Sequence, residues 1–313
     1  MRIAFMGTPE LAAISLSALL SSAHDVVAVV SQPDRPSGRG RKLVPTPVAA
    51  VARQAKVPLL QPDSVGTPAF REWLSSHRPD IAVVAAFGRI LGPKLLALPP
   101  QGCINVHASI LPRWRGASPI QSAILAGDSE SGVTIMQMVR ALDAGDMLHT
   151  VRTPISAEDT ASTLHDRLAE LGAAALLDTL EKLEAEGITP VAQDEDEVTY
   201  APRIAKADGD LDWRRRAEEL DRQIRGLHPW PGTRCTHSER GLTLKLHPPA
   251  TALTSTTTAP PGTILAATPA GVDVACGEGT VLRLMTLQAP GKKPLNVGAF
   301  LSGFPLHSGE VLR

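Results

Sequence analysis

The chain has 313 residues, of which 43% are hydrophobic and 20% charged, and its formal net charge is −1. This composition is ordinary for a folded soluble protein, and the length favours two compact domains. No apolar run approaches the ~18 residues that a membrane-spanning helix needs, and the net charge argues neither for nor against an acidic partner.

Strand-like and helix-like segments alternate along the first part of the chain. The first apolar run leads into Gly7-Thr-Pro-Glu, which supplies a turn, an N-cap threonine and a proline at the first helical position. Continuous apolar runs are typical of strands buried on both faces. We therefore predict an α/β, Rossmann-like domain with a mostly parallel sheet and helices on both faces. The strands are predicted at Arg2–Met6, Val26–Val30, Ile81–Phe87, Cys103–His107 and Val133–Val139, and the later helices at about 46–56, 67–77, 117–126 and 159–186.

The pattern changes near residue 190. The acidic run Asp194–Glu197 and scattered prolines and glycines indicate a linker, and a charged helix at about 213–226 follows it. The spacing of the short β-like runs after this helix suits a small β-barrel of the OB type, although other small β folds fit equally well. These runs lie at 242–247, 262–267, 271–276 and 280–288. We predict a catalytic domain at 1–189, a linker at 190–208 and an OB-like domain at 209–313.

Two polar residues stand out on the predicted strand 103–107. Asn105 and His107 are two positions apart, so their side chains point to one face, at the edge where ligands bind in such sheets. Asp143 follows the predicted strand 133–139, and we expect it at the same carboxyl edge. On this pattern alone, a structural role for Asn105 and His107 is as well supported as a functional one. A turn aspartate, in addition, commonly caps its own backbone.

An amide, an imidazole and a carboxylate together suit attack by an amine on a carbonyl carbon. Asn105 and a protonated His107 could stabilise the negative charge that develops on the carbonyl oxygen. Asp143 could take the amine proton directly or through water. Ser109 lacks the elbow setting that activates a serine nucleophile, so we expect its hydroxyl to contact substrate instead.

A cationic loop follows the second predicted strand. Arg35, Arg39, Arg41 and Lys42 alternate there with proline and glycine. From charge alone a solvated flexible loop is the favoured interpretation. Its position beside the cleft would also let it bind phosphates of a nucleic acid.

Several other motifs argue against particular kinds of site or segment. Gly7-Thr-Pro lacks the G-x-G-x-x-G fingerprint of nicotinamide-binding domains. The nine histidines show no metal-ligand spacing, and the three cysteines form no CxxC pair, so we predict neither a metal nor a disulfide framework. The N-terminus meets a glycine, a proline and an acid too early for a signal peptide, and we expect a cytoplasmic protein.

The segment INVHASILPRWRGASPI, followed by GVTIMQM and LDAGDM, resembles the folate-dependent formyltransferases. Further matching stretches run nearly from end to end: MGTPE, QPDRPSGRGRK, AEDT, HPWPG, PGTIL and GKKP. Two departures are visible. Ala108 stands where glycine is usual, and Phe87 where a tyrosine is common; both substitutions keep size and apolarity nearly unchanged.

The resemblance implies a reaction, a donor and an acceptor. Asn105, His107 and Asp143 fall at the family's catalytic positions, and the formyl donor would be 10-formyltetrahydrofolate, with no metal. The donor-binding positions match Ser109, Ile110, Leu111 and Pro112, Arg89, Ile90 and Leu91, and the loop from Met138 to Asp143.

The basic loop and the C-terminal domain narrow the resemblance to members that formylate methionyl initiator tRNA. Arg39 then matches an arginine that reaches the tRNA end. A monomer is expected. The alternatives are a small acceptor, either glycinamide ribonucleotide or an amino-sugar nucleotide, and a non-catalytic RNA-binding protein.

Overall fold

The computed structural model describes residues 1–37, 42–185 and 187–313. The chain forms two compact units. Unit 1 comprises Met1–Pro119, Ser131–Thr153 and His165–Ala201, and unit 2 comprises Ile120–Glu130, Pro154–Leu164 and Pro202–Arg313. The domain bounds expected from the sequence stay a prediction. No helix in the described ranges has both the length and the apolar composition to cross a membrane.

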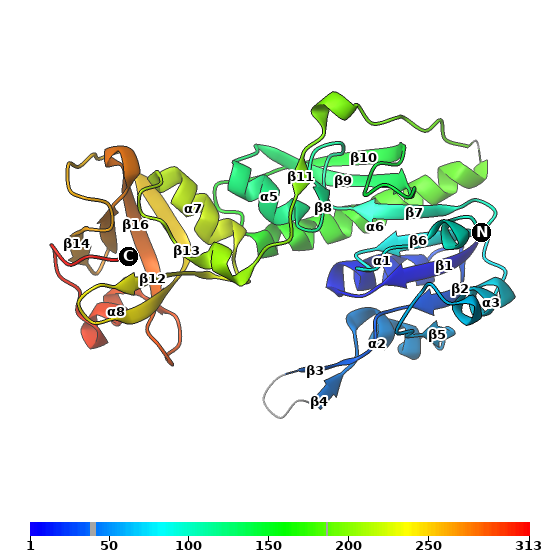
Figure 1. Cartoon of the computed structure of the whole chain (residues 1–313), viewed down its shortest axis with the longest axis horizontal. Helices are drawn as coiled ribbons and strands as arrows, with labels where there is room; N and C mark the ends of the chain where they lie inside the picture. Colours follow the sequence, from blue (N-terminus) through cyan, green and yellow to red (C-terminus); the bar gives the residue numbers. More distant parts are fainter. Residues whose placement is uncertain (38–41, 186) are drawn as a thin grey trace. The chain divides into compact units, whose positions relative to one another are not determined.

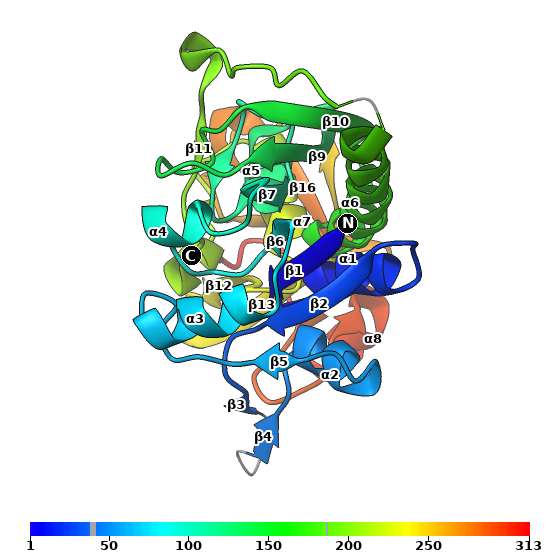
Figure 2. The ribbon, with the colours of Figure 1, turned by 90° about the vertical axis from the view of Figure 1, so that its right-hand side faces the viewer.

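Unit 1 is built on a seven-stranded sheet in the order β10-β9-β7-β6-β1-β2-β5 (Figures 1 and 2). The strands from β7 to β5 run parallel, while β9 is antiparallel to β7. This confirms the predicted α/β class with a mostly parallel sheet. The strands are β1 (Arg2–Gly7), β2 (Asp25–Val30), β5 (Leu59–Leu60), β6 (Ile81–Ala85), β7 (Cys103–His107), β9 (Glu130–Gln137) and β10 (Met147–Pro154).

Helices cover both faces of this sheet. In the view along the strands, α1 and α6 lie on one side and α3 and α4 on the other (Figure 2). Residues at their N-termini favour two of these helices. Thr46 caps α2 and Thr67 caps α3, because each hydroxyl accepts a hydrogen bond from a backbone N–H, and a proline follows each threonine. The helices are α1 (Glu10–Leu20), α2 (Pro47–Gln54), α3 (Pro68–Ser76), α4 (Pro93–Leu96) and α6 (Ala161–Ala185).

Two small additions to unit 1 fall where loop and linker were expected. The strands β3 (Arg35–Ser37) and β4 (Lys42–Val44) pair antiparallel within the basic segment. In the predicted linker, β11 (Tyr200–Ala201) pairs in parallel with β8 (Arg115–Gly116), and the two lie side by side in Figure 1. We call residues 191–201 the strap. They therefore pack as part of unit 1.

Unit 2 contains an antiparallel sheet in the order β12-β13-β16-β15-β14, with β17 on β16. The C-terminal segment bridges both edges, because Leu312 pairs with His237 of β12 and Val311 pairs with Thr263 beside β14. Closing the edges in this way gives the barrel-like domain expected from the sequence. The strands are β12 (Thr233–His237), β13 (Leu242–Leu253), β14 (Ile264–Thr268), β15 (Gly271–Ala275), β16 (Val281–Gln288) and β17 (Leu295–Asn296). The α-helices of unit 2 include α5 (Pro119–Ala126), α7 (Ala217–Gly226) and α8 (Val297–Gly303).

Candidate active site

Asn105 and His107 project from one face of β7. Asn105 lies beside Val84 of β6 and opposite Met136 of β9, and residues two apart on a strand share a face. The Asn105 side chain is half-buried and makes no hydrogen bond to any residue that the structure describes. His107 is buried, with 5% of its surface exposed. The site thus holds an amide that is available to a ligand.

The imidazole of His107 contacts a backbone carbonyl on one side and a carboxylate on the other. Its Nε2 lies 3.0 Å from the Trp114 carbonyl oxygen, and its Nδ1 lies 3.8 Å from Oδ2 of Asp143. A carbonyl oxygen only accepts hydrogen bonds, so Nε2 must carry a proton and donate it to Trp114. Nδ1 is therefore the ring nitrogen that faces Asp143 and the open side of the site.

Asp143 reaches His107 by a different route from the one expected. Because β9 is antiparallel to β7, the end of β9 lies at the amino end of β7, with Gln137 beside Ile104. The predicted reason for placing Asp143, a shared carboxyl edge, is therefore wrong. The loop after β9 instead folds back over the face that carries Asn105, as the contact with His107 shows.

The carboxylate of Asp143 does not cap its own turn. Its Oδ2 accepts a hydrogen bond of 2.9 Å from the Gly116 backbone N–H. Asp143 has a φ of 47°, in the left-handed region that costs a non-glycine residue roughly 1–2 kcal/mol. Nearby, a Cβ on Gly145 would lie 1.9 Å from the Gln137 carbonyl oxygen. The turn is thus held in one narrow conformation, which fixes where the carboxylate points.

The strap supplies contacts that the sequence did not indicate. Nε2 of Gln193 donates to the carbonyl oxygens of Asp143 and Gly145, at 2.8 Å each. Oε1 of Gln193 accepts from the buried Arg115 at 2.9 Å. Gln193 was missed because it lies in an acidic stretch without apolar periodicity, which read as a linker.

The predicted donor segment Ser109–Pro112 follows β7 directly. Ser109 is buried, and its hydroxyl donates to the Arg113 carbonyl oxygen at 2.6 Å. The buried Thr134 of β9 donates to the Ser109 carbonyl oxygen and accepts from the Leu111 N–H. Ile110 and Pro112 are half-buried. The segment is anchored on β9, while its contact with the donor stays a prediction.

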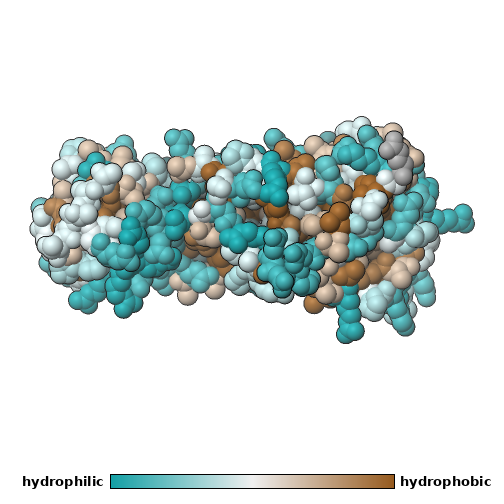
Figure 3. All heavy atoms as spheres, turned by 90° about the horizontal axis from the view of Figure 1, so that it is seen from above, coloured by the Kyte–Doolittle hydropathy of each residue, from teal (hydrophilic) through white to brown (hydrophobic). Residues whose placement is uncertain are grey.

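Arg89–Leu91 and the loop after β9 approach a common apolar cluster. Phe87 and Leu91 belong to a cluster that includes Val84, on the same face as Asn105, and Met138 packs against it. The two loops leave large apolar side chains exposed: Ile90 (92%), Val139 (46%) and Leu142 (63%). Apolar side chains also interrupt the hydrophilic surface over unit 1 in Figure 3. Exposed groups of this kind suit a flat, largely apolar ligand.

The sequence of this chain matches one family over most of its length. Residues 1–180 match formyl transferase, and residues 203–305 match the formyl transferase C-terminal domain. The chain belongs to the formyl transferase family. Among its relatives, the methionyl-tRNA formyltransferase of Marinobacter nauticus is 48% identical, over 97% of this chain and 96% of the relative. That of Stutzerimonas stutzeri is 52% identical, over 95% and 93% respectively.

Solved structures support the fold of this formyl transferase. An N-formyltransferase from Helicobacter canadensis, in complex with folinic acid and dTDP-3-aminofucose, matches with a TM-score of 0.65. The alignment covers 92% of this chain and 99% of that one, at 16% sequence identity. At that identity the likeness concerns the fold alone.

The basic residues of this formyl transferase differ in how they are placed. Arg39 and Arg41 lie outside the described residues, and Lys42 is the first residue of β4. Arg35, on β3, donates to Oε1 of Gln32 at 3.0 Å. The arginines 214–216, which immediately precede α7, form ion pairs within unit 2. Their partners are Asp212, Glu218, Glu219 and Glu278. That cluster is therefore largely neutralised.

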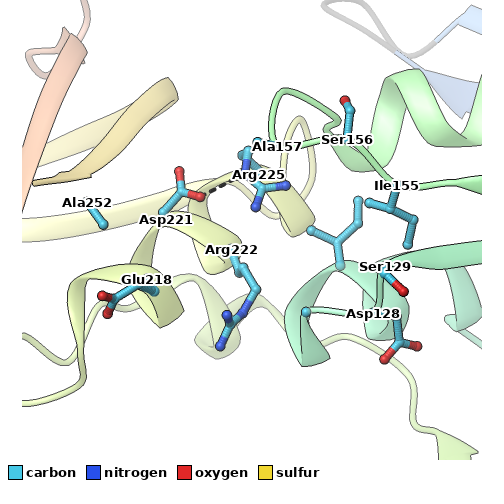
Figure 4. Close-up of a pocket in the computed structure, with 12 residues that line it drawn as sticks. Asp128, Ser129, Ile155, Ser156, Ala157, Glu218, Asp221, Arg222, Arg225 and Ala252 are labelled. Atoms are coloured by element: carbon cyan, nitrogen blue, oxygen red, sulfur yellow. Dashed lines mark hydrogen bonds and ion pairs between the residues drawn. The ribbon is translucent and has the colours of Figure 1, made fainter.

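A cavity on unit 2 of this formyl transferase lies away from the predicted site residues. It has a volume of about 310 Å³, belongs to unit 2 and contains none of the predicted site residues. Figure 4 shows Asp221, Arg222 and Arg225 of α7 around it. Burial raises the pKa of Asp221, although Arg225 donates to its carboxylate at 2.9 Å. In the described ranges, no group of three or more His, Cys, Asp or Glu residues could hold a metal ion.

Proposed function

We propose that the protein transfers the formyl group of 10-formyltetrahydrofolate to the free amine of methionyl initiator tRNA, for the initiation of translation. The observation that carries this proposal is the pair of methionyl-tRNA formyltransferases that match nearly the full chain at about half identity. The contact between His107 and Asp143 supports the chemistry, as does the Asn105 side chain, which makes no hydrogen bond within the described part of the chain.

Asn105 and His107 stabilise the oxyanion. When the amine nitrogen bonds to the formyl carbon, negative charge builds on the formyl oxygen, and donors fixed in advance stabilise that charge strongly. The Asn105 amide has no competing partner among the described residues. Because Nε2 of His107 already donates to the Trp114 carbonyl oxygen, a protonated Nδ1 is the nitrogen that donates to the reacting atoms.

Asp143 receives the proton that the amine loses. Its Oδ2 is held by the Gly116 N–H, and its Oδ1 makes no hydrogen bond to any residue that the structure describes. Oδ1 is therefore the oxygen that accepts the proton, directly or through one water. The bond from the formyl carbon to the donor nitrogen then breaks, and that nitrogen is protonated.

The residues around the site fit the folate donor. The exposed Ile90, Val139 and Leu142 offer apolar surface for a pterin ring, and the backbone of the same loops offers hydrogen-bonding groups. Arg89 precedes Ile90 and is exposed. These residues would bind and orient the donor beside Asn105.

The basic segment and the barrel-like domain would both serve the tRNA acceptor. Arg35, Arg39, Arg41 and Lys42 would contact the acceptor stem through its phosphates, and the barrel-like domain would bind the body of the tRNA. We expect the protein to act as a monomer in the cytoplasm.

One assay tests this function. The protein is incubated with 10-formyltetrahydrofolate labelled in the formyl group and, in separate reactions, with methionyl-tRNA, glycinamide ribonucleotide and an amino-sugar nucleotide. Label on methionyl-tRNA alone is the expected result. Label only on a small acceptor would overturn the proposed acceptor, and label on none would leave the RNA-binding alternative.

A further inference from the structure

Gln193 of the strap connects a buried arginine with the turn that carries Asp143. The side chain donates from Nε2 to the Asp143 and Gly145 carbonyl oxygens, at 2.8 Å each, and accepts at Oε1 from Nε of Arg115 at 2.9 Å. Arg115 is only 3% exposed. A single amide thus satisfies three polar groups beside the candidate site.

The chemistry of its neighbours fixes the orientation of this amide. An arginine only donates and a carbonyl oxygen only accepts, so Oε1 must face Arg115 and Nε2 must face the turn. Arg115 is itself held, because its two terminal nitrogens donate to the two carboxylate oxygens of Glu195, at 2.8 and 3.3 Å. An Arg–carboxylate fork of this kind has a fixed geometry.

The strap also determines the partners of Asp143 and His107. Gly116, whose N–H binds the Asp143 carboxylate, pairs with Ala201 of β11. Trp114, whose carbonyl oxygen accepts from His107, donates its own N–H to Oγ1 of Thr199 at 2.9 Å. Both catalytic side chains are therefore held through residues 193–201.

We propose that Gln193, oriented by Arg115, is a positioning residue for Asp143, so that the strap serves the active site through this side chain. Gln193 touches no reacting atom. It fixes the two carbonyl groups of a turn whose conformation is disfavoured for aspartate, and so holds the carboxylate in reach of the amine proton. The inference rests on the proposed function, because its assay is formyl transfer.

The test compares Gln193→Leu and Gln193→Glu with the unmodified protein. Leucine removes both sets of hydrogen bonds, whereas glutamate keeps the acceptor for Arg115 and loses the donors to the turn. We expect kcat to fall about 10- to 100-fold in both variants, while the KM for each substrate changes less than about threefold. A merely structural role would not separate kcat from KM in this way, so the split between the two constants is the diagnostic readout.

Two variants serve as controls. Asp196→Asn changes an exposed side chain of the same strap, and should leave kcat and both KM values unchanged. Gln223→Leu removes a similar arrangement in unit 2, where Nε2 of Gln223 donates to the Asp208 and Asp210 carbonyl oxygens. It should lower the free energy of unfolding while leaving kcat per folded molecule unchanged.

Each outcome decides the inference. A kcat within about threefold of normal for Gln193→Leu, or a loss that disappears when activity is corrected for the folded fraction, would overturn it. A glutamate variant with normal kcat would show that the donors to the turn are not needed. Failure of the unmodified protein to transfer formyl would instead count against the proposed function, so the two failures are distinguishable.

Discussion

Replacing Gly145 by alanine tests whether the position of Asp143 limits the reaction. A Cβ at this residue would lie 1.9 Å from the Gln137 carbonyl oxygen and 2.8 Å from its carbonyl carbon. Contacts of a Cβ with backbone below 3.0 Å are essentially absent from real structures. Because both partners are backbone atoms, the turn must move by about 1 Å to accept the methyl group.

That movement should act mainly on kcat, and less on the free energy of unfolding. A displacement of about 1 Å in a reacting group costs on the order of 100-fold in rate. We expect kcat of Gly145→Ala to fall by about that factor, with KM for the donor and the acceptor less affected. Steady-state formyl transfer at saturating methionyl-tRNA measures kcat, and urea unfolding measures the stability of the same sample.

Two other glycines provide matched controls. A Cβ at Gly66 would meet its nearest atom at 3.7 Å, an ordinary contact distance. Gly66→Ala should therefore change neither kcat nor the stability. Gly209→Ala is nearly as crowded, 2.2 Å from the Gly232 carbonyl oxygen, but lies in unit 2. It should lower stability while leaving kcat per folded molecule intact. A normal kcat for Gly145→Ala would refute the claim that the turn positions a catalytic carboxylate.

Three further changes separate donor binding, acceptor binding and barrel closure. Thr134→Val leaves two backbone groups of segment 109–112 without their hydrogen-bond partner. It should destabilise the protein by about 1–3 kcal/mol in urea unfolding and raise the KM for the donor. An unchanged KM for the donor would count against the role of this segment. Arg39→Ala should raise the KM for methionyl-tRNA far more than that for the donor, and equal effects on the two would contradict the predicted tRNA contact. Although burial opposes ionisation, hydrogen bonds from the backbone of His307 and from His237 hold the pKa of Glu310 below its usual value. A lowered pKa means that the ionised carboxylate contributes stability above its unfolded pKa of about 4.3 and loses it as the pH falls further. Glu310→Gln should therefore be less stable than the unmodified protein at pH 7 and nearly equal at pH 3; a difference that persists at pH 3 would contradict this.

The sequence predicted the parts of unit 1 in which local pattern and tertiary role agree. The continuous apolar runs of β1, β2, β6 and β7 identified a buried parallel sheet, and alternation on β7 put Asn105 and His107 on one face. Strands with weaker patterns were harder to predict. The predicted run ended at residue 247, whereas β13 crosses Pro248 and Pro249 and continues to Leu253.

The rest of the candidate site depended on long-range contacts that no local pattern reveals. Asp143 was identified correctly as a neighbour of His107, but for a wrong reason, since the antiparallel direction of β9 cannot be read from its composition. Gln193 was missed because its partners, Arg115 and the Asp143 turn, lie 78 and 50 residues away in the chain. The burial of Arg115, which requires partners for its guanidinium, is itself a feature of the folded structure, so the sequence carried no signal for Gln193.

The most direct test of the whole account is the single-turnover rate of formyl transfer to methionyl-tRNA in Asn105→Ala and Asp143→Ala. Removing a preorganised oxyanion donor costs about 100- to 1,000-fold in rate. We predict a loss of at least that size for Asn105→Ala and virtually no turnover for Asp143→Ala, with unfolding curves close to those of the unmodified protein. Near-normal rates in both folded variants would contradict the central claim that these side chains carry the reaction.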